Sequence, residues 1–333
     1  MLPDSQVSRR NAVLVLTLGG TIAMAGDGPG GVAPRLTGAD LVAAVPGLAE
    51  EAAVEVEDFR QVPSAGLTVE DVAELAGRVE KAGAEGFAGV VITQGTDTLE
   101  ETSFLLDLLY RGEAPVVLTG AMRHPGIAGA DGPANLLAAV RTAASPVARH
   151  LGVLVVFNDE IHAARWVRKT HATSPGAFSS PNAGPIGRMA EGAPRVHATP
   201  EGRPTVGRPL TRRVKVEVVT AALGSDGVLL DGLADRVNGV VVAAFGAGHV
   251  PESWVAGLGT LAARLPVVLA SRTGAGGVLS RTYAFPGSES DLLARGLISA
   301  GTLDPYKARL LLLAHLAAGS DRATIVAAFA DHL

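Results

Sequence analysis

Cysteine is absent from the 333 residues of this chain, so disulfides, thiolate metal ligands and cysteine nucleophiles are excluded. Aromatic residues make up only 4% of the sequence, against 47% hydrophobic residues in total, so alanine, valine and leucine must fill the interior. Long apolar runs are also missing. The run Ala12–Leu18 is too short for the core of a signal peptide and far too short to span a bilayer. We therefore expect a soluble cytoplasmic protein that does not bind membranes.

An excess of basic residues is absent as well. The chain has 28 Lys and Arg residues against 33 Asp and Glu residues, which gives a formal net charge of −5. There is no basic stripe with interleaved aromatic residues, which argues against nucleic acid as the partner. The eight histidines show no metal-ligand spacing, and Asp159, Glu160 and His162 are better explained as parts of a polar loop. We predict no metal.

Short runs rich in valine and leucine alternate with helical segments along the chain, which predicts βαβ units and a mostly parallel sheet in an α/β fold. Residues 194–212 interrupt this pattern with prolines, glycines and charges. We place an inter-domain linker at 196–213, between an N-terminal domain at 11–195 and a C-terminal domain at 214–333. The expected strands include Val13–Leu18, Val54–Phe59, Pro115–Thr119, Gly152–Phe157, Val214–Val219, Val237–Ala244 and Pro266–Ser271.

One stretch, Val90–Thr102, combines a buried strand with a polar turn and a helix start. Thr98 followed by Glu101 has the spacing of a capping box, which predicts a helix from there to Tyr110. The turn residues Thr96 and Asp97 then follow the carboxyl end of a strand, where open parallel sheets bind ligands. Asp97 could orient a lysine and a water for catalysis, or it could only complement the helix N-terminus.

Two further residues have both a catalytic and an ordinary explanation. Thr21 follows Gly19-Gly20 at a strand end, where a hydroxyl could act as a nucleophile or could simply cap a helix or turn. Lys169 lies in a polar segment, where lysines are usually solvated. If Lys169 faced Asp97 in a dry pocket, the pair could tune a neighbouring hydroxyl or water.

Several segments together resemble the bacterial-type L-asparaginases, in the order of that family and over nearly the whole chain. They are Leu18–Ala23, Ile92–Thr102, Thr119–Arg123, Ala130–Leu136, Gly152–Asp159, Lys169-Thr170 and Gly301–Arg309. The resemblance implies an N-terminal doubly wound domain and a smaller C-terminal α/β domain. It also implies a homo-oligomer, a dimer or commonly a tetramer, with each active site shared between the N-terminal domain of one subunit and the C-terminal domain of its neighbour.

The implied activity is hydrolysis of the side-chain amide of L-asparagine by double displacement, giving aspartate and ammonia without a cofactor. By resemblance, Thr21 matches the nucleophile that forms the acyl-enzyme. Thr96, Asp97 and Lys169 match a second cluster that sets the protonation of Thr96 and a nearby water, and Asp97 pairs with the substrate amine. Backbone N–H groups near Thr21 and Thr96 would form the oxyanion hole.

Substrate contacts are also carried over from the family. Ser64 matches the residue that contacts the substrate α-carboxylate, and the peptide around Ala121 matches the wall that holds the side-chain amide. Glu289 aligns loosely with a carboxylate that touches the substrate amine. Ala65-Gly66 stands where many members carry a glutamine and an aspartate, and His249 where members often carry an amide.

A tyrosine that the family usually carries on the loop after the first threonine is missing, because residues 24–35 contain none. Our hypothesis is that Tyr283 supplies this hydroxyl from a neighbouring subunit. The alternatives are a related amidohydrolase with a glutamine or other amide preference, and a ligand-binding homologue without activity.

Overall fold

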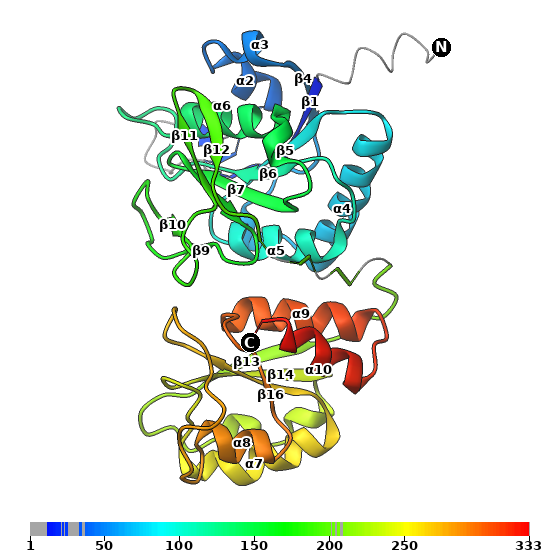
Figure 1. The fold of residues 1–333 in the computed structure, drawn as a ribbon, viewed down its shortest axis with the longest axis vertical. Helices are drawn as coiled ribbons and strands as arrows, with labels where there is room; N and C mark the ends of the chain where they lie inside the picture. Colours follow the sequence, from blue (N-terminus) through cyan, green and yellow to red (C-terminus); the bar gives the residue numbers. More distant parts are fainter. Residues whose placement is uncertain are drawn as a thin grey trace. The chain divides into compact units, whose positions relative to one another are not determined.

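The computed structural model describes residues 12–20, 22, 24–25, 33–34, 37–200, 202–203, 205–206 and 209–332. The chain divides into two compact units, Met1–Thr205 and Val206–Leu333. We call them the first and the second unit and describe each separately (Figure 1).

An eight-stranded sheet forms the centre of the first unit. Five strands are parallel, in the order β7-β6-β5-β1-β4, and β8, β11 and β12 continue the sheet beyond β7 in antiparallel pairs. The strands are β1 (Ala12–Thr17), β4 (Ala53–Asp58), β5 (Gly89–Thr93), β6 (Val116–Thr119), β7 (Val153–Phe157), β8 (Glu160–Ala163), β11 (Gly187–Ala190) and β12 (Ala193–Val196).

Helices cover both faces of this sheet, so the first unit is doubly wound (Figure 1). α2, α3 and α6 share a core with one face, in which Val91 and Leu136 are both buried, while α4 and α5 cover the other. β1 and β5 to β7 are buried along their whole length, which suits strands covered on both sides. The helices are α2 (Gly38–Ala43), α3 (Leu48–Glu51), α4 (Val69–Ala84), α5 (Leu99–Leu109) and α6 (Gly132–Ala144).

Shorter elements complete the first unit. β9 (Arg168–Lys169) pairs only with β10 (Phe178–Ser179) among the described residues, and their two-stranded ribbon is separate from the large sheet. The others are β2 (Met24–Ala25), β3 (Ala33–Pro34), η2 (Ser64–Gly66) and η3 (Pro146–Ala148).

The strand order of the first sheet reverses between β1 and β5. The chain leaves β1 toward β4 on one side and leaves β5 through α5 toward β6 on the other. In open α/β sheets, ligands bind beyond the carboxyl ends of the strands at such a reversal. The fold therefore directs attention to the residues that follow Thr17 and Thr93.

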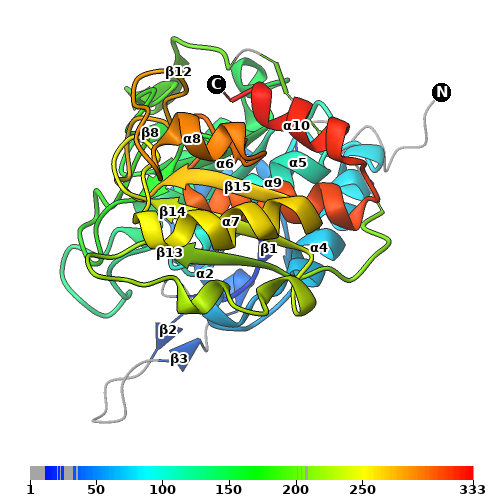
Figure 2. The same ribbon diagram turned by 90° about the horizontal axis from the view of Figure 1, so that it is seen from below.

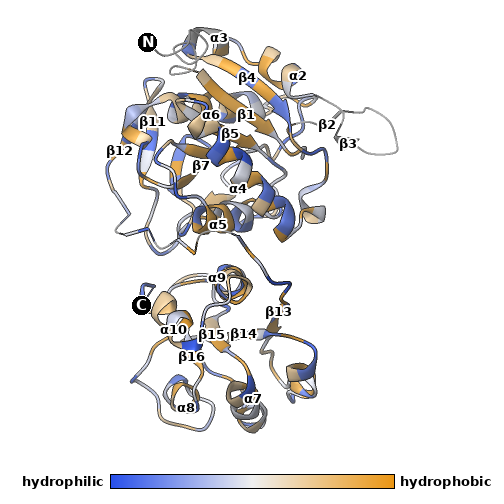
Figure 3. Ribbon diagram, turned by 90° about the vertical axis from the view of Figure 1, so that its right-hand side faces the viewer, coloured by the Kyte–Doolittle hydropathy of each residue, from blue (hydrophilic) through white to orange (hydrophobic). Residues whose placement is uncertain are grey.

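The second unit contains a four-stranded parallel sheet in the order β13-β14-β15-β16. α7 and α8 pack on one face, around the buried Trp254, and α9 packs on the other (Figures 1 and 2). Figure 3 shows strongly apolar colouring on inner strands such as β1 and β15. The elements are β13 (Val216–Thr220), η4 (Val228–Leu230), η5 (Leu233–Asp235), β14 (Gly239–Ala244), α7 (Glu252–Arg264), β15 (Val267–Ser271), α8 (Glu289–Ala294), β16 (Ile298–Ser299), α9 (Pro305–Ala317) and α10 (Arg322–Ala330).

The predicted fold class is confirmed: a doubly wound, mostly parallel sheet and a smaller α/β unit are both present. The segment 196–213, which we expected to be a linker, contains the division between Thr205 and Val206. Its first residue, Val196, is still part of β12, and Arg203 is bonded into the first unit. Among the described residues, the helices are all too short or too polar to cross a membrane.

Candidate active site

Lys169 contacts the polar turn that follows β5. Its Nζ donates to Thr96 Oγ1 at 2.9 Å and to Asp97 Oδ1 at 2.9 Å. The lysine side chain is only 15% exposed, whereas the Asp97 side chain is 70% exposed. The ammonium therefore approaches the turn from the protein side and leaves much of the Asp97 carboxylate open to solvent. The contact between Lys169 and Asp97, on which the catalytic interpretation of Lys169 depended, is present, but the exposed Asp97 side chain does not lie in a dry pocket.

Thr98 occupies the N-cap position of α5, as predicted, but the predicted capping box is wrong. Its side chain makes no cap hydrogen bond. The Thr98 hydroxyl instead donates to the Ser64 carbonyl oxygen at 2.9 Å and accepts from Gln94 Nε2 at 3.1 Å. The Thr98 hydroxyl thus bonds to a residue distant in sequence instead of to the first turn of α5. This bond joins the turn to the segment that contains Ser64.

Glycines bring the loops after β1 and β5 into direct contact. A Cβ placed on Gly20 would lie 2.1 Å from the Gly95 nitrogen, and one on Gly95 would lie 2.7 Å from Ser64 Oγ. Ser64 is itself buried, in the η2 turn that follows β4. Three loops that begin at the carboxyl ends of neighbouring strands therefore converge, and only residues without a side chain fit between them.

The turn after β6 is held by two residues that the sequence did not assign to the site. Asp131 accepts from the backbone N–H groups of Met122 at 3.0 Å and Arg123 at 2.9 Å. Asn135 Nδ2 donates to the Gly120 carbonyl oxygen at 3.0 Å. These bonds fix the backbone on both sides of Ala121, which is buried. The signal that could have revealed Asn135 is a buried amide in the first turns of α6.

Asn135 also reaches the next loop along the sheet. Its Oδ1 accepts from the backbone N–H of Asn158, directly after β7, at 3.0 Å. Asn158 has a φ of 50°, in the left-handed region. One buried amide therefore ties the loops after β6 and β7 together.

Thr21 lies outside the described residues, as do most of residues 24–35, where the family tyrosine is missing. The described neighbour of Thr21 is Gly20, with a φ of 90°. The expected nucleophile therefore directly follows, in sequence, the glycine that contacts Gly95.

Tyr283 and Glu289 belong to the second unit, in a cluster with His249. The Glu289 side chain is fully buried, and its Oε1 accepts from the backbone N–H groups of Thr282 at 3.0 Å and Tyr283 at 2.9 Å. Its Oε2 lies 3.2 Å from His249 Nε2. The Tyr283 ring is 43% exposed and packs edge-on against the His249 ring at 4.7 Å.

The pKa of Glu289 is set by two opposed effects. Burial raises this pKa. The hydrogen bonds from the backbone N–H groups of Tyr283 and Thr282, with a smaller contribution from His249, together lower it by more, so the pKa lies below its ordinary value. Glu289 is therefore ionised at neutral pH and holds the loop that presents Tyr283.

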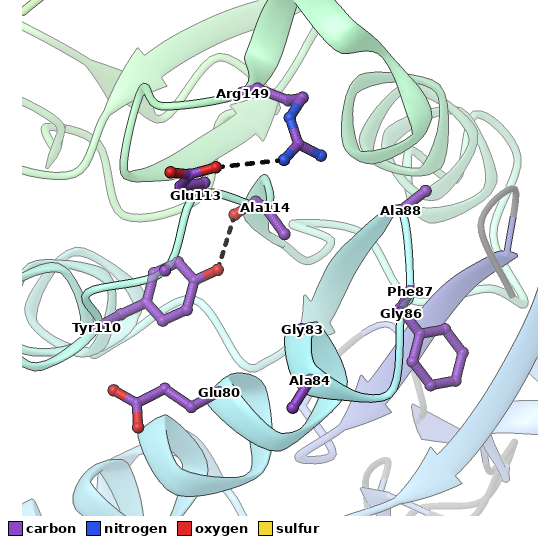
Figure 4. Close-up of a pocket in the computed structure, with 11 residues that line it drawn as sticks. Glu80, Gly83, Ala84, Gly86, Phe87, Ala88, Tyr110, Glu113, Ala114 and Arg149 are labelled. Atoms are coloured by element: carbon purple, nitrogen blue, oxygen red, sulfur yellow. Dashed lines mark hydrogen bonds and ion pairs between the residues drawn. The ribbon is translucent and has the colours of Figure 1, made fainter. Parts of the chain in front are cut away.

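A cavity of about 670 Å³ in the first unit lies at the opposite ends of the strands from the turn that contains Thr96 and Asp97 (Figure 4). It is lined by the residues just before β5 and β6, at the amino ends of the strands, including Ala88 and Ala114. Its polar contacts are a Tyr110 hydroxyl that donates to the Ala114 carbonyl oxygen at 3.1 Å and an Arg149–Glu113 ion pair at 3.6 Å. The cavity holds none of the expected catalytic residues.

Metal binding has no visible basis in the parts of the chain described: they contain no group of three or more His, Asp or Glu side chains placed to hold an ion. The contacts of Lys169 allow proton transfer and hydroxyl activation by Thr96, Asp97 and Lys169, next to the Gly20–Gly95 contact.

Comparison with known families gives a match to one family over both units. The family model "Asparaginase, N-terminal" matches residues 12–202, and "Glutaminase/Asparaginase C-terminal domain" matches residues 215–329. The chain belongs to the asparaginase family. The family expected from the sequence motifs is thereby confirmed.

Individual asparaginases resemble the chain over most of its length. A probable L-asparaginase from Deinococcus radiodurans is 42% identical over 286 residues, which are 85% of this chain and 87% of that protein. A probable periplasmic L-asparaginase from Haemophilus influenzae is 34% identical over 96% of this chain and 92% of its own length. The crystal structure of a probable cytoplasmic L-asparaginase from Campylobacter jejuni has a TM-score of 0.86 at 35% identity and covers 96% of this chain and 99% of that one.

Proposed function

We propose that this chain is an L-asparaginase that hydrolyses the side-chain amide of L-asparagine to L-aspartate and ammonia through a threonine acyl-enzyme. The observation that carries the proposal is the contact of one partly buried ammonium, Lys169 Nζ, with both Thr96 Oγ1 and Asp97 Oδ1 at 2.9 Å. The names of the similar proteins from Deinococcus radiodurans and Campylobacter jejuni support the same reaction.

In the first half of the reaction, the Thr21 hydroxyl oxygen attacks the side-chain amide carbon. An ester bond forms to Thr21 while the carbon–nitrogen bond breaks, and the leaving nitrogen gains a proton and departs as ammonia. Backbone N–H groups near Thr21 and Thr96 stabilise the oxyanion of the tetrahedral intermediate. The Gly20–Gly95 contact brings the peptides that precede these two threonines together.

In the second half, water attacks the ester and releases aspartate, and Thr21 regains its proton. Lys169 and Asp97 set the protonation of Thr96 and of this water. The exposed part of the Asp97 carboxylate pairs with the substrate α-amino group, since Oδ1 is already bonded to Lys169. Ser64 binds the substrate α-carboxylate, and the peptide at Ala121 holds the side-chain amide.

We also propose a cytoplasmic homo-oligomer, a dimer or tetramer, in which a neighbouring subunit contributes the Tyr283 hydroxyl, while the buried Glu289 holds the loop that presents it. The exposure of the Tyr283 ring supports such a role. Size-exclusion chromatography with light scattering tests the assembly, and a fully active monomer would contradict it. Unchanged turnover in Tyr283→Phe would remove that residue from the reaction. Limited proteolysis within 196–213 tests the proposed domain limits.

Glutamine is the second candidate substrate, because the matching C-terminal family model is described as glutaminase/asparaginase. Glutamine is longer than asparagine by one methylene, and a pocket distinguishes such a pair by only about 1–3 kcal/mol. We therefore expect the rates of ammonia release from asparagine and glutamine to differ by no more than about 200-fold.

The deciding experiment measures ammonia release from asparagine, from glutamine and from other amides, with Thr21→Ala as the control. We expect release from asparagine by the wild type and a large loss in Thr21→Ala. Release only from a different amide would point to a related amidohydrolase. The absence of release from every amide at high enzyme concentration would leave a ligand-binding homologue.

A further inference from the structure

We infer that Glu100 is a positioning residue for the proposed reaction: its carboxylate fixes the backbone of Lys169 so that Nζ stays on Thr96 and Asp97. The inference rests on the proposed function of Lys169. It concerns a residue that makes no contact with the substrate in that proposal and acts only through the lysine.

The contact between Glu100 and Lys169 is short and partly buried. Glu100 lies in the first turn of α5, is only 8% exposed, and accepts from the Lys169 backbone N–H at 2.5 Å through Oε2. A buried carboxylate is costly unless hydrogen bonds stabilise it, and an ionised acceptor makes a stronger bond to an N–H group than a neutral one. The bond therefore ties the Lys169 backbone to the Glu100 side chain more firmly than an exposed side-chain contact would.

Besides Glu100, the segment that carries Lys169 is held by backbone bonds from Val167 to Ala163 and from Thr170 to Ala177, and by one short ribbon. β9 is two residues long and pairs only with β10 in the described structure, with Lys169 opposite Phe178. Isolated two-stranded ribbons are marginally stable by themselves. The lysine side chain adds a flexible stem of four carbons. An anchor on the Lys169 backbone itself would define the position of Nζ more closely.

Glu100 provides that anchor from the same element that presents the reacting groups. Thr96 and Asp97 lie in the turn that leads into α5, and Glu100 lies in its first turn. Lys169 is thus held at both ends, by its backbone N–H on Glu100 and by its Nζ on Thr96 and Asp97. Both contacts are made with the start of the same helix, α5, so the movement of Lys169 relative to Thr96 is restricted.

Three substitutions at Glu100 separate the roles of length, charge and hydrogen bonding. Glu100→Ala removes the acceptor, and Glu100→Asp keeps the charge but shortens the reach. We expect both to lower kcat for asparagine by about 10- to 100-fold, since small displacements of reacting groups have effects of this size. Glu100→Gln retains an acceptor oxygen of the right length, and we expect it to restore kcat to within about fivefold of the wild type. KM should change less than kcat in Glu100→Ala.

Glu101→Gln is the matched control, because it makes the same chemical change one position along the helix, where the side chain is only partly buried. We expect wild-type kinetics from it. Thermal unfolding identifies any variant that fails to fold, and Glu100→Asp then takes the place of Glu100→Ala. A folded Glu100→Ala or Glu100→Asp with kcat within about twofold of the wild type would overturn the inference. So would a Glu100→Gln as impaired as Glu100→Ala, because charge rather than the hydrogen bond would then matter.

A crystallographic measurement separates this inference from the proposed reaction. In Glu100→Ala, we expect the Nζ of Lys169 to move away from Thr96 Oγ1, from which it lies 2.9 Å in the native chain. Glu100→Gln should retain that distance. If the wild type releases no ammonia from any amide, the proposed function fails, and the two crystal structures still decide whether Glu100 positions Lys169. An unmoved lysine in Glu100→Ala refutes the inference independently of activity.

Discussion

Gly20 and Gly95 approach each other so closely that a Cβ on Gly20 would lie 2.1 Å from the nitrogen and 2.3 Å from the Cα of Gly95. The obstructing atoms are backbone atoms, which cannot turn aside as a flexible side chain can. The contact lies where the strand order of the first sheet reverses. It fixes the distance between the loops that lead to Thr21 and Thr96.

We predict that Gly20→Ala lowers the free energy of unfolding by about 3 kcal/mol or more and abolishes ammonia release. The loss combines the strain of a φ of 90° with the clash against Gly95. Gly184→Ala is the control, because Gly184 has a φ of 75° but no atom near its added Cβ. Urea unfolding should show about 1 kcal/mol for the control. Equal losses in the two variants would mean that the contact contributes nothing.

Lys169→Met should reduce kcat/KM for asparagine by about 100-fold or more, because it removes the ammonium that contacts both Thr96 and Asp97. The fold should persist, since methionine retains most of the apolar stem. Lys81→Met, in which an ammonium with 71% side-chain exposure is removed from a surface pair, should behave as the wild type. An active Lys169→Met enzyme would exclude the lysine from the chemistry.

Asp97→Asn should raise KM for asparagine by about tenfold or more through loss of the pairing with the substrate amine. The sharper measurement uses the monoamide of succinic acid, which is asparagine without its α-amino group. We expect the wild type to prefer asparagine strongly and the variant to lose most of that preference. An unchanged preference would show that the amine is recognised elsewhere.

Arg203 anchors the end of the first unit. Its guanidinium donates to Asp107 Oδ1 at 3.2 Å, to the Gly112 carbonyl oxygen at 3.0 Å and to the Tyr110 carbonyl oxygen at 2.7 Å. We predict that Arg203→Ala lowers the free energy of unfolding by about 3 kcal/mol, since it leaves the buried Asp107 without its charged partner. Arg203→Lys should recover little of the lost stability, because one ammonium cannot reproduce the planar set of hydrogen bonds that the guanidinium donates.

The control for Arg203 is Arg264→Ala, which breaks an ion pair with Asp235 at 2.6 Å in which both side chains are more than half exposed. Exposed pairs of this kind contribute about 0–1 kcal/mol. Comparable losses at Arg203 and Arg264, measured by chemical denaturation, would contradict a special role for the Arg203 anchor.

We predict that stability depends on pH through His315 in α9. Burial lowers its pKa below the ordinary value of 6.5, so the neutral form is favoured in the folded state. The unfolded chain then binds more protons at mildly acidic pH, and stability is complete above pH 6.5 and falls as the pH drops below it. Urea unfolding at about pH 7.5 and about pH 5.5 should show a smaller loss on acidification in His315→Gln than in the wild type. An identical loss would contradict the assignment.

Local patterns in the sequence predicted much of the fold and little of the site geometry. Thr37 and Thr68 cap α2 and α4, because each finds its partner three residues ahead. Thr98 has a similar pattern but bonds to Ser64, 34 residues away in sequence. Local spacing does not reveal which of two such partners is present in the folded state.

The antiparallel strands and the β9–β10 ribbon could not be predicted from local sequence patterns. β8, β11 and β12 have four residues each and include charged residues or proline, so they lack a clear apolar run. β9 consists of Arg168 and Lys169 alone. The contact of Lys169 with Thr96 joins residues 73 positions apart, and only the fold determines it. From the sequence one could infer that a catalytic Lys169 must face Asp97, but only the folded structure shows that it does.

The hydrogen bond from Thr98 to the Ser64 carbonyl oxygen has a consequence for how this enzyme can be altered. Together with the Gly20–Gly95 contact and the packing of Ser64 against Gly95, it joins the loops after β1, β4 and β5 into one assembly. A loop taken alone from a related enzyme would meet mismatched neighbours on two sides. Substrate preference in this chain should therefore be transferable only when the segments around Gly20, Ser64 and Thr98 are exchanged together, and single-loop chimeras should lose stability before they change specificity.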